Sequence, residues 1–252
     1  MRQFGLIGFP LSHSFSKKYF TEKFSDEGIS ASYENFPLEN ISELLPLIEK
    51  NSLLEGINVT IPYKQSVIAF LDKMSDVVRD IGACNCIRIK DKKLEGFNTD
   101  VIGFETALSA HLSPIHRRAL VLGTGGAAKA VCYVLEKKAI PYLRVSRNQK
   151  PGLLSYEDVT ASMLHEHLLI INTTPLGMYP EVNNCPDLPY EAIGESNYLF
   201  DLVYNPSMTL FLQKGKANGA IIENGYSMLE VQAEESDWQY EPEDAEPARL
   251  RY

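Results

Sequence analysis

The sequence predicts an α/β protein built from two domains. Short apolar runs that suit strands alternate with segments whose apolar residues recur at helical spacing. A glycine-rich turn near residue 123 lies where one such strand should pass into a helix. The chain has 252 residues, of which 44% are hydrophobic and 23% charged, so it can fill two modest cores.

The first 100 residues predict a mixed sheet covered by helices. Residues 86–89 and 93–97 are expected to pair as a hairpin across 90–92, which makes the sheet partly antiparallel. The other predicted strands are 5–9, 31–36 and 57–61, and the predicted helices are 15–27, 44–48, 67–70 and 77–81.

The rest of the chain predicts a second domain with further buried strands. No repeat or low-complexity linker separates the parts, which favours two domains packed over a shared cleft. We expect domains at 1–101 and 102–226, with a C-terminal helix within 227–252 that returns to the first domain. Here the predicted strands are 119–122, 142–146, 168–171, 198–203 and 220–222, and a helix at 101–111 marks the boundary.

The glycine-rich turn predicts a dinucleotide-binding domain. It follows the apolar run 119–122 and precedes a helix-like segment, which is the context that such a fingerprint requires. A first glycine allows the tight turn, a second lets backbone approach the phosphates, and a small third residue lets helix pack on strand. The domain is therefore expected to be a Rossmann-type, doubly wound fold that uses Gly123, Gly125, Gly126 and Ala127.

Basic residues at the end of the next predicted strand, 142–146, and just beyond it favour NADP over NAD. An NAD site would place a carboxylate about 20 residues beyond the glycines, and none is present there. Arg144, Ser146, Arg147 and Lys150 lie there instead, and a guanidinium can pair with a 2′-phosphate. Ser146 and Arg147 are the predicted phosphate ligands.

Charge and cysteine content point to a small-molecule enzyme of the cytoplasm. The formal charge is −9, of which residues 233–252 carry −5, so nucleic acid is not an expected partner. No apolar run is long enough to cross a membrane. Cys84, Cys86, Cys132 and Cys185 show no metal-ligand spacing and are expected to be reduced, mostly buried thiols.

Three polar clusters in the first domain could hold a substrate beside the dinucleotide. They lie at 8–16, 58–64 and 96–100, each where a strand should end. Lys64 and Asp100 would form a proton-transfer pair, in which the ammonium polarises a carbonyl and the carboxylate orients it. Serines 14 and 16 could instead cap a helix, Asp100 could do the same, and Lys64 could be an idle surface lysine.

Taken together, the motifs resemble the shikimate dehydrogenase family. The similarity covers nearly the whole chain and rests on seven motifs in order rather than on any one of them. They are G-x-P-L-x-H-S-x-S, N-V-T-I-P-Y-K, G-A-x-N, G-x-N-T-D, G-x-G-G-A-A, D-x-x-Y-x-P and G-x-x-M-L-x-x-Q-A.

The resemblance implies NADP-dependent reduction of 3-dehydroshikimate to shikimate, in the route to chorismate and the aromatic amino acids. It implies that Lys64 and Asp100 are catalytic. The implied substrate ligands are Ser14, Ser16, Thr60, Asn85, Tyr204 and Gln232. The implied further cofactor contacts are Asn172, Thr173, Thr174, Gly225 and Met228.

The sequence also departs from the family pattern, and alternatives stay open. Lys17 follows Ser16 where proline is common, Cys86 follows Asn85 where threonine is usual, and Ser146-Arg147-Asn148 replaces N-R-T or N-R-S. A quinate or dual quinate/shikimate dehydrogenase is the nearest alternative, and a non-catalytic NADP-binding protein is a remote one. The protein is expected to act as a monomer or a homodimer.

Overall fold

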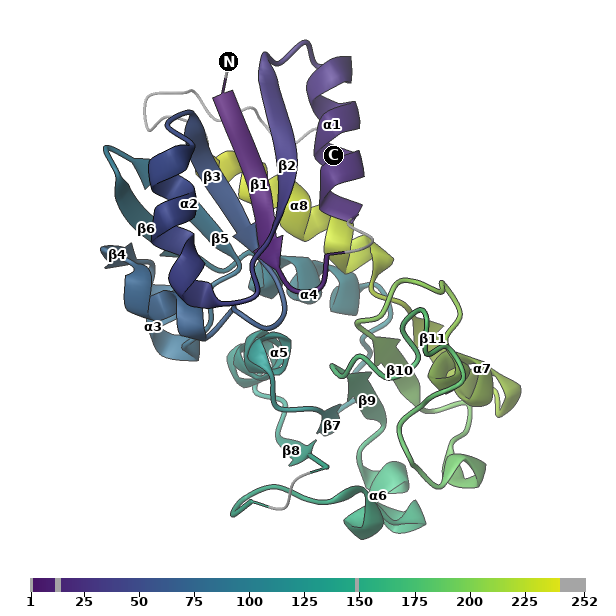
Figure 1. Ribbon diagram of the computed structural model, residues 1–252. Coiled ribbons are helices and arrows are strands. Elements are labelled where there is room, and N and C mark those ends of the chain that lie inside the picture. The colour runs from purple at the N-terminus through teal and green to yellow at the C-terminus, as the bar shows by residue number, and fades with distance from the viewer. Residues whose placement is uncertain (1, 12–14, 148–149, 241–252) are drawn as a thin grey trace. The chain divides into compact units, whose positions relative to one another are not determined.

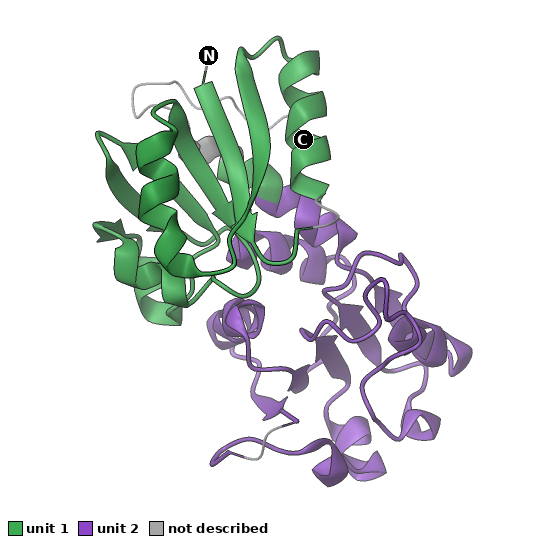
Figure 2. Cartoon of the chain, in the orientation of Figure 1, with its two compact units in different colours: residues 1–99, 233–252 green, residues 100–232 purple. Residues whose placement is uncertain are grey.

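The computed structural model describes residues 2–11, 15–147 and 150–240. The chain divides into two compact units, which are coloured separately in Figure 2. Unit 1 comprises Met1–Thr99 and Ala233–Tyr252, and unit 2 comprises Asp100–Gln232. Each unit contains one β-sheet, so the predicted α/β fold with a mixed and a parallel sheet is confirmed.

The sheet of unit 1 is mixed and has six strands in the order β2-β1-β3-β5-β6-β4 (Figure 1). Strands β1, β2 and β3 are parallel, whereas β5 is antiparallel to both β3 and β6. Strand β4, which has only two residues, was not predicted. The bounds are β1 Arg2–Gly8, β2 Ala31–Pro37, β3 Leu54–Val59, β4 Lys73–Met74, β5 Cys86–Lys90 and β6 Lys93–Phe97.

The predicted hairpin is confirmed, with a loop one residue shorter than expected. Lys90 pairs with Lys93, so only Asp91 and Lys92 turn the chain. Both have positive φ, 52° and 62°, which is the backbone of the two-residue turn that matches the twist of paired strands.

Helices cover both faces of this sheet. On one face, Phe20 and Phe24 of α1 pack with Phe4 and Tyr33, and Ala233 of α8 joins them. On the other face, helices α2 and α3 and a 3-10 helix cover a second apolar cluster. The bounds are α1 Phe15–Asp26, α2 Leu44–Lys50, α3 Asp76–Ile81 and α8 Tyr226–Tyr240, with 3-10 helices at Ile41–Glu43 and Ser66–Phe70.

The sheet of unit 2 is entirely parallel, in the order β11-β10-β9-β7-β8 (Figure 1). Its central strands are buried on both faces, as a doubly wound sheet requires. The bounds are β7 Ala119–Leu122, β8 Tyr142–Val145, β9 Leu169–Asn172, β10 Tyr198–Asp201 and β11 Ile221–Glu223.

Helices also flank both faces of the second sheet. Leu164 of α6 and Phe211 of α7 pack on one face, and Phe104 of α4 meets Phe200 edge-on across 5.2 Å on the other. Neither α6 nor α7 was predicted. The bounds are α4 Asp100–Ser109, α5 Gly126–Lys137, α6 Ala161–Glu166 and α7 Leu210–Ala217, with 3-10 helices at Tyr156–Asp158 and Tyr190–Ala192.

Helix α8 is continuous, but it contributes residues to both units, since the division between them falls between Gln232 and Ala233. Its first part crosses α4 closely within unit 2. A side chain at Gly103 would lie 2.6 Å from the carbonyl oxygen of Met228, so this crossing requires glycine.

All four cysteines are free thiols, three of them buried, as predicted. Within the described part of the chain, no helix has the length and apolar character needed to cross a membrane.

Candidate active site

The predicted polar residues of unit 1 gather at one edge of its sheet. Strands β1 and β3 end there, and β5 begins there because it runs antiparallel to β3. Cys86, the first residue of β5, pairs with Phe97, the last residue of β6. The segments that follow β3, precede β5 and follow β6 therefore meet, although they are distant in sequence.

Backbone hydrogen bonds hold the lysine segment at this edge. The Thr60 amide donates to the Ile7 carbonyl at 2.9 Å, and the Val59 amide donates to the Asn85 carbonyl at 2.8 Å. The Cys84 amide donates to the Lys64 carbonyl at 2.7 Å. The main chain at Lys64 is thus fixed next to the residues that precede β5, and Lys64 as a whole is half-buried.

Asn85 and Thr99 clamp the end of β6 through a reciprocal pair of hydrogen bonds. The Thr99 amide donates to Asn85 Oδ1 at 2.7 Å, and Asn85 Nδ2 donates to Thr99 Oγ1 at 3.0 Å. Each residue is only 2% exposed, so these bonds form where water cannot replace them. Asp100, the next residue, begins α4 and is 4% exposed. Its pairing with Lys64 stays a prediction, because the two residues belong to different units.

Ser16 lies in the first turn of α1 and is buried. The ring of Tyr33 of β2 packs against the same helix, stacked on Phe20 with ring centroids 4.7 Å apart. Burial raises the pKa of Tyr33 well above its usual range, and the side chain of Ser16 opposes this rise. Ser14, the other predicted serine, lies outside the described residues.

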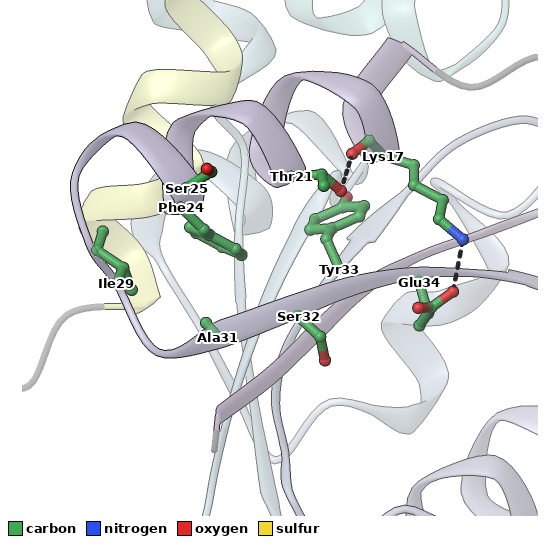
Figure 3. Close-up of a pocket in the computed structure, with 9 residues that line it drawn as sticks. All are labelled: Lys17, Thr21, Phe24, Ser25, Ile29, Ala31, Ser32, Tyr33 and Glu34. Atoms are coloured by element: carbon green, nitrogen blue, oxygen red, sulfur yellow. Dashed lines mark hydrogen bonds and ion pairs between the residues drawn. The ribbon is translucent and has the colours of Figure 1, made fainter.

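An open pocket of about 340 Å³ lies between α1 and β2 (Figure 3). Its charged groups neutralise each other, since Lys17 Nζ lies 2.7 Å from Glu34 Oε2. None of the predicted catalytic or substrate-binding residues lines it. We therefore place the candidate site at the strand ends and not in this pocket.

Unit 2 has its own polar edge, where all five parallel strands end. Leu122 pairs with Val145 on one side and with Asn172 on the other, so the residues after β7, β8 and β9 are neighbours. The chain moves from β7 to β8 in one direction and then crosses to β9 on the far side of β7. Ligands of such sheets bind at this change of direction, which here lies between β7 and β9.

Gly123 occupies this point and must be glycine. Its φ is +118°, a conformation that other residues rarely adopt. A side chain there would also overlap Thr173 Oγ1, which itself donates to the Leu122 carbonyl at 2.7 Å. The first fingerprint glycine thus lets the turn after β7 fit against the turn after β9.

Gly125 is open, in contrast with Gly123. It caps the N-terminus of α5 with an ordinary extended backbone, φ −75° and ψ −172°. No atom outside its immediate neighbours lies within 4 Å of the position a side chain would take. Gly126 and Ala127 follow in the first helical turn, whose amides lack partners within the helix. This small, donor-rich space at a helix N-terminus suits a phosphate.

Ser146 and Arg147 follow β8 directly, so the strand ends one residue earlier than predicted. The Ser146 amide donates to the Leu154 carbonyl at 2.8 Å, which ties this turn to the segment after it. Arg147 is exposed, and its charge opposes the rise in the pKa of Tyr156 that burial causes. Arg144 lies within β8, as predicted.

A fully buried carboxylate, Asp201, organises the next two strand ends. Its Oδ1 accepts from Asn172 Nδ2 at 2.9 Å and from the Val203 amide at 3.0 Å, and its Oδ2 accepts from the Thr209 hydroxyl. Asn172 in turn accepts two hydrogen bonds from Thr174, from its amide at 3.1 Å and its hydroxyl at 2.6 Å. The turns after β9 and β10 are therefore held by one network.

The last predicted residues lie after β10, after β11 and on α8. Tyr204 is half-buried beyond β10. The Gly225 amide donates to the Val203 carbonyl at 3.3 Å, and a side chain at Gly225 would overlap the backbone of Leu202. Met228 is buried, and Gln232 Nε2 donates to the Leu229 carbonyl at 3.1 Å.

Asp201, Thr99, Tyr33 and Ser236 are polar residues of these edges to which the sequence analysis gave no role. Asp201 begins the motif D-x-x-Y-x-P and could have been given a role, because a carboxylate that ends an apolar strand needs partners. Thr99 lies in the motif G-x-N-T-D, whereas Tyr33 and Ser236 give no local signal, since a single hydroxyl residue in a strand or helix is usually unremarkable.

Replacing Asp201 by asparagine should remove a pH-dependent cost to stability. Burial raises the pKa of Asp201 to about 6, so the folded protein keeps a proton that the unfolded chain releases near pH 4. Stability is therefore lost as pH rises from about 4 through 6, by roughly 3 kcal/mol for a shift of this size. The introduced asparagine would keep both accepted bonds at Oδ1, and its amide could donate to Thr209. In urea unfolding from pH 4 to 8, the free energy of unfolding of Asp201→Asn should rise relative to that of the wild type as pH rises.

Asp158→Asn is the matched control in the same unit. Hydrogen bonds from Ser155 lower the pKa of Asp158, so the stability that this carboxylate contributes changes only at and below about pH 4. The free energy of unfolding of Asp158→Asn should therefore stay at a nearly constant offset from that of the wild type between about pH 4 and 8. A stability difference between Asp201→Asn and the wild type that does not change with pH would contradict the prediction.

Comparison with known proteins identifies the family. Residues 6–87 match the family model described as the shikimate dehydrogenase substrate binding domain. The NADP(+) shikimate dehydrogenase of Clostridium beijerinckii is 41% identical over 251 residues, which cover 95% of this chain and 92% of that protein. The counterpart from Caldanaerobacter subterraneus is 36% identical and covers 91% of this chain and 88% of its own length.

Solved structures agree with this result. Shikimate dehydrogenase 1 from Peptoclostridium difficile superposes with a TM-score of 0.83 at 34% identity, covering 95% of this chain and 91% of that one. The Thermus thermophilus shikimate 5-dehydrogenase, solved with NADP(H) and shikimate, gives 0.84 at 30% identity, with 95% and 93% covered. With identities above 30% over nearly its full length, the chain belongs to the shikimate dehydrogenase family.

Proposed function

We propose that this protein is an NADP-dependent shikimate dehydrogenase, which reversibly reduces 3-dehydroshikimate to shikimate. The observation that carries this proposal is the polar edge of unit 1. There, the Asn85–Thr99 clamp holds the residue before Asp100, and the Cys84 amide holds the main chain of Lys64. The curated relatives bear the same activity in their names.

The residues of unit 2 fit the cofactor. Gly125 leaves open space at the N-terminus of α5, and a pyrophosphate is the kind of anion that helix amides and the helix dipole bind. Arg147 and Ser146 follow the neighbouring strand, where the 2′-phosphate of NADP would be recognised. When bound, NADPH supplies hydride donation.

Lys64 and Asp100 would supply the proton chemistry. The Lys64 ammonium would polarise the substrate carbonyl, stabilise the negative charge that develops on its oxygen and protonate it. The Asp100 carboxylate would orient that ammonium. Because these interactions strengthen as charge develops, they would lower the barrier more than they tighten binding.

Hydroxyl and amide groups would bind the remainder of the substrate, which carries one carboxylate and several hydroxyls. Asn85 would serve the ring hydroxyls, since its amide carries both donors and an acceptor. The other proposed ligands are Ser14, Ser16, Thr60, Tyr204 and Gln232. On the cofactor side, Asn172, Thr173, Thr174, Gly225 and Met228 would line the path of NADP.

The predicted domains would divide the two tasks: 1–101 would bind substrate and 102–226 would bind NADP, with the C-terminal helix within 227–252 returning to the first domain. The two sheets and the passage of α8 from unit 2 to unit 1 support this proposal. We further propose a cytoplasmic location, supported by four free thiols, and a monomeric or homodimeric state.

A four-way assay tests the function. Purified protein is given shikimate or quinate, each with NADP or NAD, and reduction of the dinucleotide is followed by its absorbance. Shikimate with NADP should give the highest kcat/KM. Comparable rates with quinate would instead support the dual-specificity alternative, and no turnover with either acid would reject the proposal.

Lys64→Ala should lower kcat by about 10²–10⁴-fold, the usual contribution of a positioned acid or base. Shikimate binding, measured by calorimetry, should change much less because the lost interaction acts mainly on the transition state. Lys73→Ala, which removes an exposed lysine of the same unit, should leave both quantities unchanged. Normal turnover by Lys64→Ala would exclude Lys64 as the proton donor.

Gly125→Ala should weaken NADP binding by about tenfold or more without loss of stability. The backbone at Gly125 accommodates alanine, and the methyl group would occupy the open space assigned to the phosphates. Gly194→Ala makes the same change in another open part of unit 2 and should bind NADP normally. NADP affinity is measured by calorimetry. Equal affinities of the two variants would contradict the assignment of the phosphate site to the N-terminus of α5.

A further inference from the structure

A chain of buried polar side chains runs beneath the polar edge of unit 1. The Tyr33 hydroxyl donates to Asn58 Oδ1 at 2.8 Å, and Asn58 Nδ2 donates to Ser236 Oγ at 2.9 Å. Ser236 Oγ lies 3.1 Å from Thr99 Oγ1, where either hydroxyl can be the donor. These four residues are all buried.

Both ends of this chain reach residues that the proposed function assigns to substrate. At one end, Tyr33 packs on α1, the helix that carries Ser16: its ring stacks on Phe20 with centroids 4.7 Å apart, and the Ser16 side chain opposes the rise in its pKa. At the other end, Thr99 forms the reciprocal pair with Asn85. Ser16 and Asn85 lie in different parts of unit 1, so the buried chain fixes their positions relative to each other.

Ser236 is the central link and comes from the far end of the sequence. It lies on α8, 178 residues after Asn58 and 137 after Thr99, and it is fully inaccessible to solvent. One hydroxyl here joins the end of β3 to the segment that follows β6. A buried hydroxyl costs free energy unless it is hydrogen-bonded, and Asn58 and Thr99 are among the partners that satisfy Ser236.

We infer that Ser236 is a positioning residue for substrate binding, which acts through Asn58 and Thr99 to fix Ser16 and Asn85. The inference rests on the proposed function. Without the Ser236 hydroxyl, Asn58 and Thr99 would each lose a partner in a place that water does not reach. They would then shift to find others, and the two ligands would move with them.

Ser236→Ala should raise both the KM for shikimate and its dissociation constant by about tenfold, because a buried partner group is left unsatisfied. The KM for NADP should stay within about twofold, since the hydrogen-bonded chain lies wholly in unit 1. Shikimate affinity is measured by calorimetry without cofactor, and thermal unfolding is recorded alongside. Tyr33→Phe, which cuts the chain at its other end and keeps the ring, should show the same selective loss.

Ser75→Ala is the matched control. It deletes a half-buried serine hydroxyl of unit 1 that caps α3 by accepting from the Val78 amide at 3.3 Å. This variant should lose thermal stability yet bind shikimate normally, which separates lost stability from lost positioning.

The outcomes distinguish this inference from the function on which it rests. A wild-type protein that neither binds nor turns over shikimate would reject the proposed function itself. If the wild type does both, an unchanged shikimate KM in Ser236→Ala, or equal increases for shikimate and NADP, overturns the inference. Should Ser236→Ala not fold, Tyr33→Phe decides by the same criteria.

Discussion

The reciprocal hydrogen bonds between Asn85 and Thr99 are the interaction on which the polar edge of unit 1 depends. They join the residue before β5 to a residue just after β6, and they do so where both side chains are almost wholly buried. In such a place, a shift of either residue would leave amide groups without partners, so the arrangement has little freedom. The start of α4, and with it Asp100, follows directly from this point.

In unit 2, a buried carboxylate holds the strand ends in place. Asp201 gathers Asn172, Thr209 and the Val203 amide at the ends of β9 and β10. Burial makes its ionised form costly, and the hydrogen bonds offset only part of that cost. The benefit is geometric, because the turns after both strands are set by one side chain.

Much of the fold could be predicted because its signals are local. Apolar runs indicated the strands, and the glycine turn indicated the parallel sheet with a helix after β7. Strand β4 was missed because two residues carry no periodicity. One or two helical turns give only a weak repeat, so α2 and α3 were predicted whereas α6 and α7, of similar length, were missed. The site divides in the same way: Gly123 and Lys64 stand in recognisable motifs, whereas Ser236 matters only through partners far away in sequence, which no local pattern reveals.

Helix α8 has a consequence for how the protein is made. Unit 1 begins with the first strand of the chain, yet it receives Ser236 only after all of unit 2 has been synthesised. Until then, a nascent chain on the ribosome holds Asn58 and Thr99 without the hydroxyl that joins them. The order of translation therefore lets the second unit fold as a continuous segment first, whereas the first unit is completed last despite emerging earliest.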